Sequence, residues 1–221
     1  MSEANVLLTG RAERNKLDKR ERLIRAAREL FRTRGFDATT TGEIAQRAGV
    51  AKGTLFFHAK SKEALLVMMF QRDVGRAIER GFATMPADAP IISQLMHVFK
   101  AMLRQHQRDI GLARVFVKEL GFVRGDRHGI EGVLHDMFAR LAAVIEDAKR
   151  RRELRRDIDS LLLARNLFAL FFVFLLEWLG SGERSPSRRR PSLHEMLEMQ
   201  LSGLRCSSAK SSTQSDAVCV G

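Results

Sequence analysis

The segment from Thr40 to Lys62 constrains the fold most tightly, because its residue types match two short helices joined by a tight turn. Thr40 can cap the first helix, and Glu43 lies three residues later, where a carboxylate completes a capping box. Gly49 stands where this helix must end, a position that favours a residue tolerating a positive φ. The segment therefore predicts a helix-turn-helix motif.

The second helix of the motif is expected to begin at about Lys52, with Leu55 and Phe56 directed inward. In a helix-turn-helix this second helix enters the major groove of DNA. Small and basic residues remain on its outer side, where they allow close approach and suit phosphate oxygens. A helical hairpin with merely solvated basic residues is the alternative interpretation. The predicted DNA contacts are base edges for Thr54 and His58, a sugar or thymine methyl for Phe57, phosphates for Thr40, Thr41, Lys52 and Lys62, and close backbone approach at Gly53.

The run from Leu23 to Leu65 resembles the DNA-binding domain of the tetracycline-repressor (TetR) family over about a fifth of the chain. The resemblance implies a homodimer whose fourth helix bridges the DNA-binding domain to a C-terminal domain. Family members usually carry tyrosine at position 56 or 57 and a larger apolar residue at 59, where this chain has Phe56, Phe57 and Ala59. The shared pieces are Phe31–Arg34–Gly35–Phe36, Thr40–Thr41, Glu43–Ile44–Ala45, Ala48–Gly49–Val50, Gly53–Thr54–Leu55 and Ser61–Lys62–Glu63.

The net charge of +12 favours a polyanionic partner such as nucleic acid. Residues 1–62 hold 14 Lys and Arg against 7 Asp and Glu, so +7 of that charge lies at the N-terminal end, which indicates DNA binding there. Cys206 and Cys219 provide neither a disulfide framework nor metal-ligand spacing. Residues 1–10 lack the pattern of a signal peptide. We therefore expect a cytoplasmic protein that associates with the nucleoid when bound to DNA.

The rest of the chain shows helical spacing of apolar residues and no alternating strand pattern, so we predict an all-α fold. It combines an N-terminal three-helix domain with a C-terminal helical domain for ligand binding and dimerisation. The first helix is expected from about Leu17 to Arg34. The predicted units are a flexible basic arm at 1–17, the DNA-binding domain at 18–78 with its motif at 41–60, the C-terminal domain at 79–205 and a disordered tail at 206–221.

The segment from Ile158 to Leu179 is the most apolar part of the chain. Its uninterrupted apolar run, 167–176, is shorter than the roughly twenty residues that a membrane-spanning helix needs. A helix that is apolar all round must be covered on several sides, and a second subunit can supply that cover. We predict a homodimer through 158–179 and 193–204 and no membrane association. A membrane-associated protein anchored through 161–179 is the alternative.

Catalytic chemistry finds no support in the sequence, because none of the six histidines lies in a metal or triad pattern and no glycine-rich phosphate loop occurs. We predict no enzyme, no metal and no cofactor. Phenylalanine and methionine side chains of the middle helices can pack adaptably around an apolar ligand. Periodicity alone favours simple filling of a helical core, whereas the resemblance to the TetR family implies a pocket. The candidate ligand-binding residues are Met96, Phe99, Met102, Phe116, Met137, Phe168 and Phe172.

Together these observations predict a ligand-responsive repressor that binds a palindromic operator as a dimer. Its expected partners are double-stranded operator DNA, a second copy of the chain and an unidentified small-molecule effector. Two-fold symmetry would place the paired recognition helices about 34–36 Å apart, or a multiple of that distance. A regulator of the same fold that activates transcription is an alternative within this class.

Overall fold

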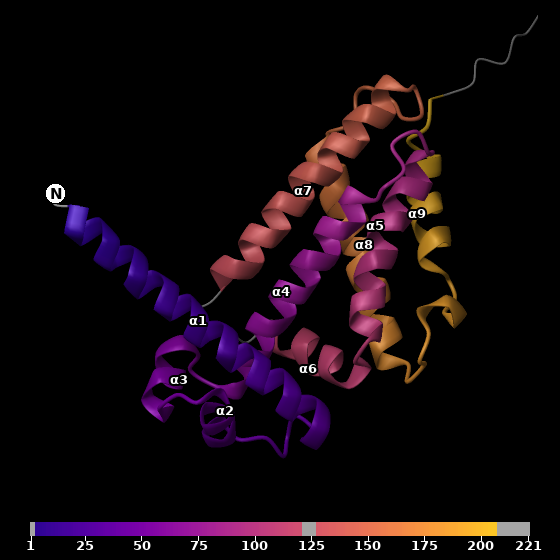
Figure 1. Cartoon of the computed structure of the whole chain (residues 1–221). Coiled ribbons are helices and arrows are strands. Elements are labelled where there is room, and N and C mark those ends of the chain that lie inside the picture. Colours follow the sequence, from indigo (N-terminus) through magenta and orange to yellow (C-terminus); the bar gives the residue numbers. More distant parts are fainter. Residues whose placement is uncertain (1–2, 121–126, 207–221) are drawn as a thin grey trace, which may run out of the picture.

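The computed structural model describes residues 3–120 and 127–206, and the regular elements in these ranges are helices (Figure 1). The predicted all-α architecture is confirmed. The elements are α1 (Glu3–Arg34), α2 (Thr41–Ala48), α3 (Lys52–His58), α4 (Lys62–Ala83), α5 (Ile91–Gln107), α6 (Ile110–Leu120), α7 (Arg127–Arg150), α8 (Ser160–Gly180), the short 3-10 helix η1 (Pro186–Arg188) and α9 (Leu193–Ser202).

Helices α1, α2 and α3 form a small unit around one apolar stripe of α1. Leu23 and Ala27 of that stripe are completely buried. Ile44 of α2 and Leu55 of α3 are also completely buried in the same cluster. Each helix buries only a few apolar side chains, so its stability depends on packing against the other two rather than on its own length.

Helix α1 begins at Glu3, much earlier than the predicted start at Leu17. The predicted flexible arm at 1–17 is therefore helical from Glu3 onward. The sequence between these positions lacks proline and is rich in Ala, Glu, Leu, Arg and Lys, which favour helix. This N-terminal part of α1 projects away from the rest of the molecule (Figure 1).

Helix α4 joins the N-terminal unit to the remaining helices and packs against α1, α5, α6 and α7 (Figure 1). Its N-terminus is capped by Ser61, whose hydroxyl accepts a hydrogen bond from the amide of Ala64. Arg28 of α1 lies 2.7 Å from the carboxylate of Asp73 and ties the two helices together. The predicted domain boundary at 78/79 falls inside this continuous helix, so any motion between the halves must move α4 itself.

Aromatic stacking joins the C-terminal helices to α4. Phe70 of α4 stacks on Phe116 of α6 with ring centroids 4.6 Å apart. His106 of α5 packs beside both rings and is hydrogen-bonded through Nδ1 to the carbonyl of Met102 at 2.8 Å. Burial lowers the pKa of His106, so the ring is neutral at pH 7. Phe99 stacks on Phe171 in the same way and joins α5 to α8.

The charged run at 149–156 is only partly solvated: Arg150, Arg152, Arg155 and Arg156 are exposed, but other charges of the run have partners in the fold. Lys149 is buried and lies 2.9 Å from Glu146 while also donating to the carbonyl of Ile158. The carboxylate of Glu153 accepts a hydrogen bond of 2.7 Å from the backbone amide of Ile91, the first residue of α5. Because the chain reverses directly after α7, these charges satisfy backbone groups of neighbouring segments.

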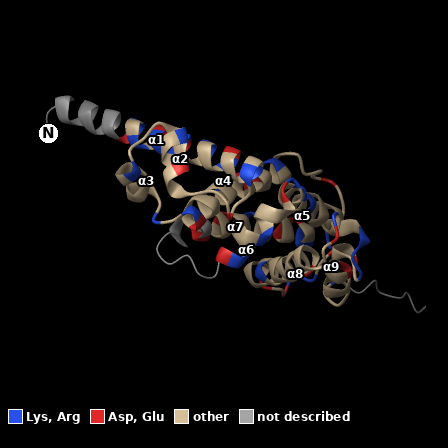
Figure 2. Cartoon of the chain, turned by 90° about the horizontal axis from the view of Figure 1, so that it is seen from below, with Lys and Arg blue, Asp and Glu red and all other residues tan. Residues whose placement is uncertain are grey.

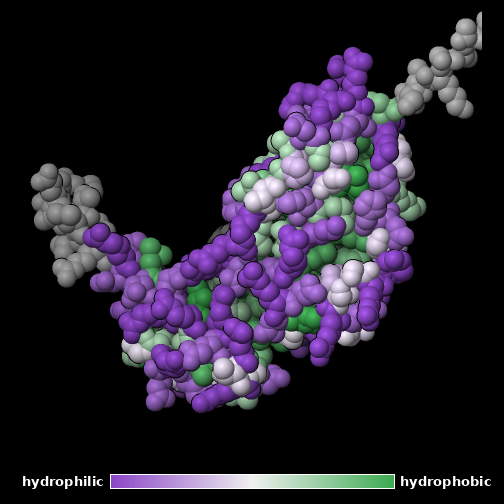
Figure 3. Space-filling model, turned by 45° about the vertical axis from the view of Figure 1, so that its right-hand side comes forward, coloured by the Kyte–Doolittle hydropathy of each residue, from purple (hydrophilic) through white to green (hydrophobic). Residues whose placement is uncertain are grey.

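Helix α8 has one buried and one exposed side. Its buried side includes Leu167, Phe171 and Trp178, which pack in the core. Its exposed side carries apolar residues as well, including Leu162 and Val173. By length and composition α8 is the described helix that could cross a membrane, a test that the core helix of a soluble protein also passes. Hydrophobic side chains also reach the surface of the C-terminal part among hydrophilic ones (Figure 3).

Candidate nucleic-acid interface

The predicted capping box at the start of α2 is present. The hydroxyl oxygen of Thr40 accepts a hydrogen bond from the amide of Glu43 at 3.2 Å. In return, the Glu43 carboxylate accepts hydrogen bonds from the amide and the hydroxyl of Thr40, both at 2.8 Å. These two hydrogen bonds, with the nearby charge of Arg34, lower the pKa of Glu43. The cap therefore fixes where α2 begins.

The turn between α2 and α3 is held by Arg22, which reaches it from α1. The Arg22 guanidinium donates to the carbonyl of Ala48 at 2.9 Å through Nε and at 2.6 Å through Nη2. Nη2 also donates to the carbonyl of Gly49 at 2.8 Å. These carbonyls end α2 and would otherwise lack a partner, and a charged donor makes the hydrogen bonds strong. This contact could not be predicted from local sequence patterns, because the carbonyls lie 26 and 27 residues from Arg22 along the chain.

Gly49 satisfies two requirements at this turn. Its φ of 63° lies in the left-handed region that glycine adopts without strain. A Cβ at this position would also lie only 2.7 Å from Nη2 of Arg22. The predicted role of Gly49 as the end of α2 is confirmed, and the approach of Arg22 adds a steric reason for glycine.

Helix α3 packs on the unit through Leu55 and Ala59, which are 0% and 4% exposed. The prediction that Phe56 is directed inward is wrong, because this side chain is 44% exposed. A helix turns by about 100° per residue, so Phe56 cannot share the face of Leu55 and Ala59. The small Ala59 at the end of the helix is buried without a larger apolar side chain.

The outward face of α3 consists of Lys52, Gly53, Phe56 and Phe57, with Phe57 74% exposed. Phe56 belongs to this face although it was not predicted there, and its spacing from Lys52 and Gly53 was the available signal. Thr54 and His58 are half-buried on the flank of the helix, and Thr41 is half-buried at the start of α2. Among the predicted DNA contacts, the structure thus brings Lys52, Gly53 and Phe57 together on one exposed face.

His58 lies near three cations of α1. Burial, followed by the charges of Lys16, Arg20 and Lys19, lowers the pKa of His58. The imidazole is therefore neutral at pH 7 and offers one donor and one acceptor nitrogen. Its ring meets that of Phe57 edge-on with centroids 5.4 Å apart.

Two of the predicted phosphate contacts have partners within the domain. The Lys62 ammonium donates to the carbonyls of Phe36 and Asp37 at 2.9 and 3.0 Å and lies over the Phe36 ring. The hydroxyl of Thr40 takes part in the capping box. These side chains hold the loop before α2, and their contact with phosphate stays a prediction.

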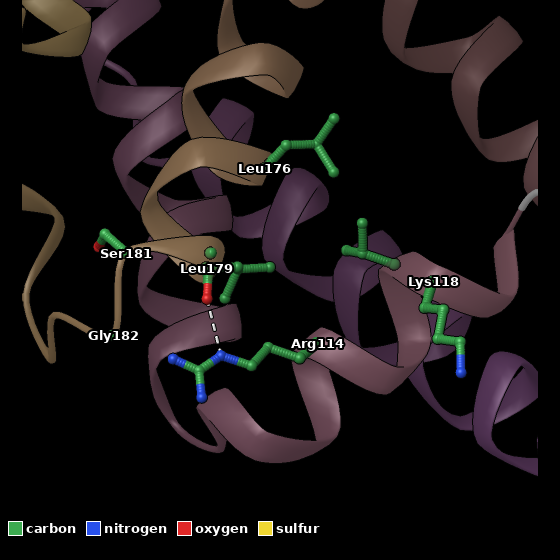
Figure 4. A pocket seen from close by; sticks show the side chains of 8 residues that line it. Arg114, Lys118, Leu176, Leu179, Ser181 and Gly182 are labelled. Atoms are coloured by element: carbon green, nitrogen blue, oxygen red, sulfur yellow. Dashed lines mark hydrogen bonds between the residues drawn. The ribbon is translucent and has the colours of Figure 1, made fainter.

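A separate groove of about 620 Å³ lies between α6 and the end of α8 (Figure 4). Leu176 and Leu179 line it from α8, and the guanidinium of Arg114 lies at its edge, donating to the carbonyl of Leu179 at 2.7 Å. Lys118 adds a second cation (Figure 4). The groove therefore combines apolar walls with positive charge. Within the described residues, His, Cys, Asp and Glu form no group of three that could hold a metal ion.

None of the seven predicted ligand-binding residues lines this groove. Four of them are buried in the core: Phe99, Met102, Phe116 and Met137. Met96, Phe168 and Phe172 are partly buried against the same core. Their packing matches the alternative interpretation, in which the stripe fills a helical core, and their contact with a ligand stays a prediction.

Comparison with known proteins identifies the family. A family model described as "Bacterial regulatory proteins, tetR family" matches residues 23–69. The Thermus thermophilus FadR, a TetR-family transcriptional repressor solved in complex with lauroyl-CoA, is 30% identical, with 83% of this chain and 91% of that chain covered and a TM-score of 0.56. The chain belongs to the TetR family. The predicted family is confirmed, and this TetR-family protein is a DNA-binding transcriptional regulator.

Two similar proteins of Bacillus subtilis differ in how much of their length matches. The fatty acid metabolism regulator protein of Bacillus subtilis is 24% identical over 172 residues, which are 77% of this chain and 89% of that protein. The B. subtilis regulator YerO is 41% identical, but over only 63 residues, which are 28% of this chain and 22% of that protein. The longer match includes C-terminal helices, whereas the shorter one covers little more than a quarter of the chain.

Gly49→Ala is predicted to lower the free energy of unfolding by about 1–2 kcal/mol, because alanine is strained in the left-handed region. Displacement of Arg22 adds to this cost. Gly132→Ala is the matched control, since Gly132 lies in α7 with nothing within 4 Å of an added Cβ. This control should gain about 0.5–1 kcal/mol from helix propensity. Urea unfolding at one protein concentration measures both, and equal effects would contradict the role assigned to the turn.

Proposed function

We propose that this TetR-family regulator binds a palindromic operator as a homodimer, with α3 of each subunit in the major groove. The observation that carries the proposal is the exposed face of α3, formed by Lys52, Gly53, Phe56 and Phe57 on a helix whose other side is buried. Gly53 has nothing within 4 Å of an added Cβ, so DNA can approach its backbone closely. Lys52 suits a phosphate, and the phenylalanine rings suit sugars and thymine methyl groups.

The half-buried Thr54 and His58 are proposed to contact base edges from the flank of α3. A neutral His58 can donate one hydrogen bond and accept another, as edges in the major groove require. Thr41 and Thr40 at the start of α2 are proposed to lie at the phosphate backbone, beside the helix N-terminus. The division into a DNA-binding part at 18–78 and a ligand-binding and dimerisation part at 79–205 is proposed to follow the family.

The exposed side of α8 is proposed to form the dimer interface together with α9. Leu162, Ala169 and Val173 are exposed at spacings of seven and four residues, which places them on one stripe of α8. On the neighbouring α9, Met199 is 81% exposed. Burying such a stripe against its two-fold copy would remove apolar surface from water. This arrangement accounts for the apolar character of α8 without a membrane.

A ligand-responsive repressor is the form of regulation that we propose, with a fatty acyl-CoA as effector. Support comes from the lauroyl-CoA complex of the T. thermophilus repressor. The groove beside Arg114, which combines apolar walls with two cations, suits a ligand with an acyl chain and phosphates.

Lauroyl-CoA is predicted to release the protein from a labelled operator, whereas free coenzyme A should not. Retention of the operator at saturating lauroyl-CoA would exclude this effector.

Lys52→Gln is predicted to weaken binding to every duplex to a similar extent, because a phosphate contact carries no sequence information. A dimer loses two such contacts, so the slope of log K against log salt should become shallower by about 1.8. Fluorescence anisotropy with a labelled duplex at several salt concentrations measures the slope. Lys100→Gln on the exposed side of α5 removes the same charge and should leave the slope unchanged. Equal slopes for Lys52→Gln and wild type would refute the phosphate contact.

Val173→Glu is predicted to convert the dimer into monomers, because each interface would then contain two carboxylates in an apolar environment. Sedimentation at micromolar concentration measures the change in mass. Ser93→Glu provides the control, since it adds the same charge at an exposed position of α5. A Val173→Glu protein that remained dimeric would place the interface elsewhere.

A further inference from the structure

The exposed N-terminal part of α1 carries a face that the motif itself does not require. Residues 13–20 are all exposed, unlike the buried positions that follow. Within the three-helix unit, the face of α1 directed at α2 and α3 carries Leu23, Ile24 and Ala27. Counting back from Leu23 by three, four and seven residues, the same side of the helix carries Arg20, Lys19 and Lys16. The side that is apolar inside the unit therefore carries three cations outside it, together with the exposed Leu17.

These cations lie beside the end of α3. Lys16 precedes the buried Leu23 by seven residues, or about 10 Å along the helix axis. Figures 1 and 2 show this part of α1 next to α3 in two views. The lowered pKa of His58, to which Lys16, Arg20 and Lys19 contribute by their charges, agrees with that proximity. The cations of α1 thus adjoin the end of α3 that carries His58.

Within the described residues, neighbouring carboxylates neutralise this face only weakly. Lys16 lies 3.9 Å from Glu13, and both side chains are more than half exposed. Such surface ion pairs contribute little to stability, so Lys16 can exchange Glu13 for another anionic partner. Asp18 pairs instead with Arg22 at 3.8 Å. Among the described residues, neither Lys19 nor Arg20 forms an ion pair.

We infer that Lys16, Lys19 and Arg20 form a second DNA contact, which binds phosphates outside the stretch that α3 contacts. This inference rests on the proposed binding of α3 to DNA and extends it. A rigid helix holds the three cations at fixed spacing, so they can bind the backbone without the ordering cost of a flexible arm. The contact adds affinity but no base specificity.

The test compares two triple variants of equal net charge on a labelled random-sequence duplex of 40 base pairs, about four helical turns. One variant is Lys16→Gln/Lys19→Gln/Arg20→Gln. The control is Lys100→Gln/Arg104→Gln/Arg156→Gln, which removes two exposed cations of α5 and one from the segment between α7 and α8. The α1 variant should have a salt slope at least about two units shallower than wild type, since each lost phosphate contact removes about 0.9. The control should keep the wild-type slope.

A charge-preserving variant, Lys16→Arg/Lys19→Arg/Arg20→Lys, should also keep the wild-type slope. Circular dichroism and sedimentation of each variant verify that fold and subunit number are unchanged. Equal slopes for the α1 variant and the control would overturn the inference, and so would a change in subunit number without a change in slope, which would indicate a contact between copies. Failure of the wild type to bind any duplex would instead overturn the proposed function.

Discussion

The hydrogen bonds from Arg22 to the end of α2 are the contact on which the DNA-binding unit depends most. Helix α3 has only seven residues and cannot hold its orientation alone. Its position is set by Leu55 and Ala59 beneath it and by the turn that precedes it. Arg22 joins that turn to α1, and α1 is tied to α4 through the pair of Arg28 and Asp73. The face offered to DNA is thus connected by side chains to the helix that enters the C-terminal part.

The same continuity limits how an effector can control DNA binding. Helix α4 contacts α1 at one end and α5, α6 and α7 along its length. The stack of Phe70 on Phe116, with His106 beside it, links α4 to α6, and α6 forms one wall of the groove at Arg114. A ligand that moves α6 therefore acts on α4 through packed aromatic rings. Typical coupling free energies of 1–3 kcal/mol are sufficient to change operator affinity about 5- to 150-fold.

Much of the motif could be predicted from the sequence because its signals are local. The capping box of Thr40 and Glu43 and the left-handed Gly49 each depend on residues a few positions apart, and the structure has both. The orientation of Phe56 was predicted wrongly, because the apolar pattern of the short α3 does not define one side. Its spacing from Lys52 and Gly53 was the better signal. Arg22 gave no signal because its partners are distant in sequence.

The early start of α1 was missed because a polar, charged segment suits a solvated helix and a flexible arm equally well. For the C-terminal helices, apolar spacing predicted the elements but could not separate residues that fill a core from residues that line a pocket. Phe99 and Met137 are completely buried, whereas the groove is lined partly by Arg114 and Lys118, whose charges resemble those of any solvated face.

Selection of bound duplexes from a random DNA pool tests the central claim most directly. The account predicts enrichment of an inverted repeat whose half-site centres are separated by about 10 base pairs or a multiple, because two α3 helices related by two-fold symmetry face one side of the duplex. Enrichment of a single unrepeated site, or of no sequence at all, would contradict the account of a dimer that presents paired recognition helices to DNA.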